Sequence, residues 1–113
     1  MKLSQKLTKE QINPFFIKWE NMVSDISGMH KKKDAKAKEL MGNGVILYQN
    51  LLLHCHQEGQ KPIIPLNGEE RLDFIVHNPG NYAAFRQLDE LFSEMKKMIA
   101  AKRVQLNRVN NDE

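Results

Sequence analysis

A chain of 113 residues, 41% hydrophobic and 27% charged, is long enough for one domain with its own apolar core. Its single cysteine, Cys55, excludes an intramolecular disulfide, and no segment has the apolar length of a membrane span or of a secretory signal. The net charge of +3 is too small to indicate nucleic-acid binding by itself. These limits predict a cytoplasmic protein.

The first main helix is predicted over residues 14–27. We expect Asn13 to be its N-cap and Pro14 its first helical residue, because a proline there removes no helical hydrogen bond. A turn is expected at residues 8–12, and Gly28 is expected to end the helix. Apolar residues recur at steps of three and four, which gives one continuous apolar face. They are Ile12, Phe16, Trp19, Val23 and Ile26.

A second helix is predicted from its cap, Asp34, to about Glu58. Two glycines, Gly42 and Gly44, each cost about 1 kcal/mol relative to alanine inside a helix. The sequence allows a break near Gly42 or a continuous helix in which Gly44 admits a close neighbour. We favour the continuous helix.

A third, shorter helix is predicted over residues 68–77. Asn67 is in the N-cap position, and Glu70 three residues later can act as its reciprocal partner. The following sequence, Asn78-Pro79-Gly80-Asn81, predicts a sharp corner.

The last helix is predicted to end at about Leu106. Its apolar residues follow heptad spacing, which is typical of a helix packed in a bundle: Phe85, Leu88, Phe92, Met95, Ile99 and Leu106. The sequence therefore predicts an all-α fold, a compact bundle of about four helices with the last two joined at the Asn-Pro-Gly corner. One domain is expected over residues 1–113, with flexible ends at 1–7 and 107–113.

The segment from Pro65 to Glu94 resembles the YpoC-like family. The similarity is carried by Pro65 to Leu72, Phe74, Ile75, Pro79, Tyr82, Phe85, Gln87, Leu88, Leu91, Phe92 and Glu94, with a weaker similarity at Pro14, Phe15, Phe16 and Trp19. Members of this family are small, uncharacterised helical proteins of low-GC Gram-positive bacteria. The resemblance implies a helical fold and brings no known activity, cofactor or catalytic residue.

The candidate partner-binding residues are Phe15, Phe16 and Trp19. Aromatic residues at helical spacing usually belong to the core. Here, however, they cluster with Ile12 and Ile17 beside a loose N-terminus, and one helix face is too narrow to bury them all. An exposed remainder would mark a contact with another protein or with a second copy of the chain.

Five lysines form the main basic run of the sequence, and they are the candidate phosphate-binding residues. Lysine runs of this kind usually lie solvated in a loop and in the first turn of a helix. No arginine or aromatic residue is interleaved with them to stack on nucleic-acid bases. A nucleic-acid-associated helical protein is therefore the alternative prediction. The lysines are Lys31, Lys32, Lys33, Lys36 and Lys38.

Two histidines, His54 and His56, suggest a metal site, but residues two apart lie on different sides of a helix. His54 and Glu58 could share one ion, and zinc would still need two further ligands, with His30 and His77 as candidates. A small metal-dependent enzyme is the third alternative.

Cys55 lies among leucines, so we predict a buried structural thiol rather than a nucleophile. The sequence predicts no catalytic residue, no metal and no cofactor. We predict a non-enzymatic accessory or protein-interaction module.

Overall fold

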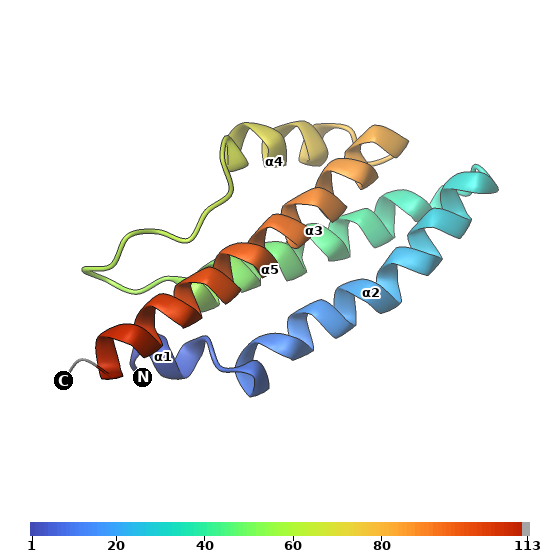
Figure 1. Ribbon diagram of the computed structural model, residues 1–113. Helices are drawn as coiled ribbons and strands as arrows, with labels where there is room; N and C mark the ends of the chain where they lie inside the picture. The colour runs from blue at the N-terminus through green and yellow to red at the C-terminus, as the bar shows by residue number, and fades with distance from the viewer. Residues whose placement is uncertain (112–113) are drawn as a thin grey trace.

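The computed structural model describes residues 1–111 and contains five helices within them (Figure 1). They are α1 (Leu3–Lys6), α2 (Lys9–Lys31), α3 (Lys36–Cys55), α4 (Gly68–His77) and α5 (Tyr82–Asn111). The all-α prediction is confirmed for this part of the chain. The helix count differs from the predicted four because α1 adds a single turn before the four longer helices.

The three long helices form the body of the molecule. α2 and α3 are an antiparallel hairpin, and α5 runs along one side of it (Figure 1). α4 covers the first half of α5 and also contacts α3. At the centre, the Trp19 ring stacks on Phe92 with 4.4 Å between centroids. The rings of Phe16 and Tyr48 contact the Phe92 ring edge-on, with centroid distances of 6.4 Å and 5.5 Å. No helix among the described residues is both long and apolar enough to cross a bilayer.

The prediction that a helix starts at Pro14 is wrong. α2 begins at Lys9 after the N-cap Thr8, and Pro14 lies inside it. An interior proline costs about 3 kcal/mol because a hydrogen bond is lost and the ring crowds the preceding turn. Continuing the helix through Pro14 buries Ile12 and Phe16 on one face, and this tertiary packing outweighs the local cost.

The predicted helix end at Gly28 is also wrong. α2 continues to Lys31, and the Lys32 N–H donates to the Gly28 carbonyl. The residue with left-handed backbone is Lys33, with φ of 53°. The turn therefore falls five residues later than the glycine suggested.

The preference for a continuous α3 is confirmed, since the helix passes through both Gly42 and Gly44. A Cβ at Gly44 would lie 2.8 Å from the Trp19 ring, so this glycine allows the close approach of α2. The helix is shorter than predicted: it starts at Lys36, whose N–H donates to Asp34 at 3.0 Å, and it ends at Cys55 rather than Glu58.

Residues 1–7, which we expected to be flexible, contain α1, and Leu3 and Leu7 are buried in the core. Polar contacts hold this segment too, since Lys6 Nζ donates to the His56 carbonyl at 3.0 Å and Arg103 Nε donates to the Leu7 carbonyl at 2.8 Å. At the other end, α5 continues through residues 107–111, and residues 112–113 of the predicted flexible end lie outside the described part.

α4 has the bounds that its sequence predicted, Gly68–His77. Asn67 precedes it with a left-handed backbone, φ of 55°, and its side chain makes no capping hydrogen bond. Residues 78–81 connect α4 to α5, and the Asn81 side chain accepts the Ala83 N–H at 2.8 Å.

Candidate functional site

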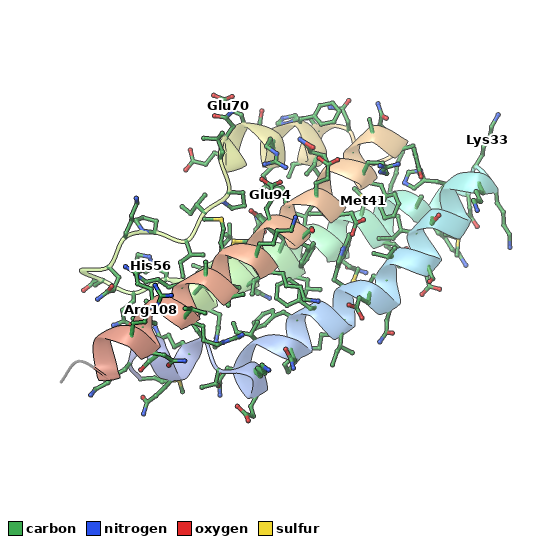
Figure 2. All side chains as sticks on the ribbon, in the orientation of Figure 1. Lys33, Met41, His56, Glu70, Glu94 and Arg108 are labelled. Carbon is green, nitrogen blue, oxygen red and sulfur yellow. The ribbon has the colours of Figure 1, made fainter. Side chains whose placement is uncertain are left out.

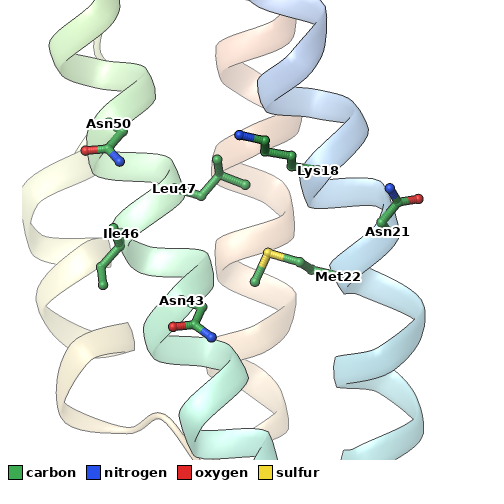
Figure 3. Close-up of a pocket in the computed structure, with 7 residues that line it drawn as sticks. All are labelled: Lys18, Asn21, Met22, Asn43, Ile46, Leu47 and Asn50. Atoms are coloured by element: carbon green, nitrogen blue, oxygen red, sulfur yellow. The ribbon is translucent and has the colours of Figure 1, made fainter.

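The α2/α3 groove is an open hollow of about 460 Å³ on the side of the hairpin that α5 leaves uncovered (Figure 3). Met22 and Leu47 are half-buried at its floor, and Ile46 beside them is 56% exposed. Polar side chains line the rest of the groove: Lys18, Asn21, Asn43 and Asn50. The antiparallel helices alone create this groove, because α2 supplies one wall and α3 supplies the other.

One side of α3 faces solvent without carrying any charge. Its residues recur at steps of three and four, which places them on a single face. We call Asn43, Ile46, Asn50 and Leu53 the uncharged α3 face; all four are exposed, and Leu53 is 72% exposed. No residue from Leu40 to Leu53 is charged. Solvent-facing sides of helices normally carry charged residues, whereas the centres of protein interfaces are depleted of them.

Charged residues lie only at the edges of this surface. Lys18 is the one charged residue lining the groove, and Glu39 lies one turn before Asn43 on α3. Both are exposed, and neither forms an ion pair within the described residues. The surface therefore has an uncharged centre, with Lys18 and Glu39 unpaired at its edges.

The predicted partner-binding residues belong mainly to the core. Phe16 is 7% exposed and Trp19 is 3% exposed, and the Trp19 indole N–H donates to Asp89 at 2.9 Å. Phe15 is half-buried with its ring 5.4 Å from that of His54. The edges of Phe16 and Trp19 reach a shallow hollow of about 170 Å³ beside Lys96. Little of the three rings is therefore available to a partner.

The five lysines of the basic run gather at one end of the molecule, around the turn between α2 and α3. All five are exposed, and Lys33 projects into solvent (Figure 2). A hollow of about 220 Å³ lies there, lined by His30, Lys38 and Gly80 among others. The His30 Nε2 atom is buried without a hydrogen-bond partner in the described residues. The five lysines therefore share one end of the molecule, and two of them, Lys33 and Lys38, line the hollow there.

An arginine-centred cluster joins α4 to α5. Arg71 donates from both terminal nitrogens to Glu94, and Nη1 also donates to the Leu66 carbonyl at 3.1 Å. The hydrogen bond with Arg71 lowers the pKa of Glu94, which lies on α5 (Figure 2). With its amide turned to satisfy both neighbours, Gln87 accepts from Arg71 Nε at 3.0 Å and donates to Glu90 at 3.0 Å. Each charge has an opposite partner, so the cluster anchors α4 rather than offering a free binding group.

The chain is similar to known proteins of one family. The family model described as YpoC-like protein matches residues 9–107. The chain belongs to the YpoC-like family. The uncharacterized protein YpoC of Bacillus subtilis (strain 168) is 49% identical over 41 residues, which cover 36% of this chain and 25% of that protein. The match thus spans about a quarter of the length of this curated relative. No solved structure matches the chain significantly.

In this YpoC-like chain, the candidate metal ligands His54 and Glu58 are not brought together with other ligands. Within the described residues, no three histidine, cysteine, aspartate or glutamate side chains gather closely enough to hold an ion. His54 is engaged elsewhere, since its Nε2 atom lies 2.8 Å from the Lys6 carbonyl oxygen. His56 is exposed beyond the end of α3.

Cys55 is a buried thiol, 3% exposed. Burial raises its pKa to about 11, and the charge of Lys6 lowers it only in part. The thiol is therefore protonated at neutral pH, which does not suit a nucleophile.

The α2/α3 groove of the YpoC-like chain was missed in the sequence because it exists only once two helices pair. One signal was present. The run from Leu40 to Leu53 has no charged residue, yet a helix of that length in a small bundle must expose one side to solvent.

Proposed function

We propose that this YpoC-like chain is a non-enzymatic, cytoplasmic protein-interaction module that docks through the α2/α3 groove and the uncharged α3 face beside it. The observation that carries the proposal is the absence of charge along an exposed side of α3, from Leu40 to Leu53. Burying the uncharged α3 face against a partner desolvates no charge on that face, so the free energy gained from burying Ile46 and Leu53 is not reduced by a charge-desolvation cost there.

The polar groups around the groove support a protein partner. Asn21, Asn43 and Asn50 can each donate and accept hydrogen bonds without carrying charge, which is typical of the polar rim of an interface. General acid or base catalysis needs titratable side chains close to the reacting atoms, and Lys18 alone lines the groove with such a group. The composition of the groove therefore favours recognition over chemistry.

The experiment is photo-crosslinking in cells from a benzophenone amino acid placed at Ile46. The matched control carries the same amino acid at Val104 on α5, which is 52% exposed and so nearly as accessible as Ile46. We expect a covalent protein adduct at Ile46 and little at Val104, with the crosslinked protein identified by mass spectrometry. Equal adducts at both positions, or none at Ile46, would contradict the proposal.

A second candidate is phosphate binding by Lys31, Lys32, Lys33, Lys36 and Lys38, supported by their gathering at one end beside the unpartnered His30 nitrogen. A nucleic-acid complex held by these lysines would weaken steeply with added salt, because released counterions contribute to its affinity. Binding of a labelled single-stranded oligonucleotide at about 50 and 200 mM salt tests this role. Salt-sensitive binding that is lost when Lys31, Lys32 and Lys33 become glutamine would support it, and no binding at the lower salt would exclude it.

A further inference from the structure

We infer that the occupant of the α2/α3 groove is a second copy of this chain, with α3 of each copy packed antiparallel against α3 of the other. This inference rests on the proposed docking function and specifies its partner. A two-fold interface brings the same surface together from both copies, so that surface must be complementary to itself. The uncharged α3 face meets this requirement in both its side chains and its flanking charges.

Two asparagines of α3 are placed symmetrically about a midpoint between Ile46 and Leu47. Reading outward from that midpoint in either direction, an aliphatic residue comes first and an asparagine follows three positions later, Asn43 on one side and Asn50 on the other. In an antiparallel pair centred there, Ile46 of one copy lies opposite Leu47 of the other. Asn43 then lies opposite Asn50, where two side-chain amides can hydrogen-bond to each other.

Farther out, Leu40 and Leu53 are equally far from the midpoint, but Leu40 is half-buried against the core and only Leu53 is exposed. Each end of the pair would therefore place one exposed leucine, Leu53, at the level of Leu40 of the other copy. Glycine at position 42 is exposed and has nothing within 4 Å of its Cβ position. A small residue there leaves room for a neighbouring helix to approach closely, as Gly44 does for Trp19 inside the fold.

The flanking charges are complementary in this arrangement. Lys18 lines the groove near Asn50 (Figure 3), and Asn50 lies opposite Asn43 of the second copy. Glu39 lies one turn beyond Asn43, so Glu39 of the second copy comes to the Lys18 end of the groove. The two-fold axis repeats this pair, so both charges that are unpaired within one chain find partners.

The expected dimer is weak. The uncharged α3 face from Asn43 to Leu53 is about 15 Å long at 1.5 Å per residue. A contact of this length, widened by α2, lies at the small end of specific interfaces, which is the range of transient association. Self-association should therefore depend on concentration between about 1 μM and 1 mM.

Sedimentation equilibrium of the purified chain over that concentration range is the test. We expect the apparent mass to rise above the 13.1 kDa of one chain toward twice that value. Ile46→Lys should remain monomeric, because it places a charge at the centre of the contact. Val104→Lys, a charge added at a similarly exposed position on α5, should associate like the wild type. Circular dichroism confirms that each variant is folded.

Charge reversal tests the orientation of the pair. Lys18→Glu should weaken association by about fivefold for each of the two ion pairs, and adding Glu39→Lys to it should restore association. A wild type that stays monomeric to 1 mM, an Ile46→Lys variant that still associates, or a double variant that fails to recover would overturn the self-pairing. A different protein crosslinked at Ile46, together with a monomeric purified chain, would overturn self-pairing while leaving the docking function supported.

Discussion

Gly42 and Gly44 lie two residues apart on α3 but have opposite surroundings. A Cβ at Gly44 would lie 2.8 Å from the Trp19 ring and 3.1 Å from Leu88, whereas nothing lies within 4 Å of one at Gly42. We expect Gly44→Ala to lower the free energy of unfolding by about 1 to 3 kcal/mol, because overpacking outweighs the gain in helix propensity. Gly42→Ala should raise it by about 0.5 to 1 kcal/mol. Urea midpoints of the two variants test this, and equal shifts would contradict the packing of α2 on α3.

Cys55 provides a second test at the scale of one residue. Its thiol is 3% exposed, and burial raises its pKa to about 11, so the reactive thiolate is scarce at pH 7 to 8. We expect a thiol reagent to modify the folded protein far more slowly than the chain unfolded in urea. Rapid modification in native buffer would show that the end of α3 opens readily.

The attachment of α4 to α5 depends on the ion pair between Arg71 and Glu94. Arg71 lowers the pKa of Glu94 below its ordinary value of 4.5 in the folded state. The stabilisation is therefore complete above about pH 4.5, and it is lost as the pH falls through the lowered native pKa. We expect Glu94→Gln to cost about 1 kcal/mol at pH 7, at the low end for charged hydrogen bonds, because the Glu94 side chain is 39% exposed and screened by solvent.

The measurement for this pair is the urea midpoint of the wild type and of Glu94→Gln at pH 7 and near pH 3. The difference between the two urea midpoints should be smaller near pH 3 than at pH 7. At the lower pH the Glu94 carboxylate of the wild type becomes protonated and, like the glutamine, carries no charge. Glu69→Gln is a suitable control, because Glu69 is exposed and forms no ion pair within the described residues. A difference that stays constant with pH would contradict the role assigned to the pair.

The helices differed in how far their sequences predicted them. The heptad spacing of α5 predicted its buried residues from Phe85 to Ile99, because an apolar residue recurs in every turn of the helix. The bounds predicted for α2 from Pro14 and Gly28 were wrong. Local propensity is a weak guide to helix ends when tertiary packing, here the burial of Ile12 and Phe16, favours a longer helix. α1 was missed because a single helical turn with one leucine, Leu3, is too short to show a periodic apolar pattern.

At the scale of the whole molecule, the candidate surface could not be derived from single helices. Phe16 and Trp19 were chosen as partner-binding residues because they are aromatic and clustered, yet α5 covers the face of α2 on which they lie. The face of α2 that stays open is the one that lines the α2/α3 groove. The groove is lined mainly by asparagines and aliphatic residues, which form no recognisable motif in the sequence. Only the pairing of α2 with α3 brings Met22, Leu47 and Ile46 into one groove.

The most direct test of the account is disulfide trapping between two single-cysteine chains, both with Cys55→Ala. One carries Asn43→Cys and the other Asn50→Cys, the two positions that antiparallel α3 helices would place opposite each other. After mild oxidation of the mixture, we expect the disulfide joining position 43 to position 50 to exceed both same-position disulfides. Same-position disulfides in excess would contradict the antiparallel arrangement, and no disulfide dimer at all would contradict a contact through the uncharged α3 face.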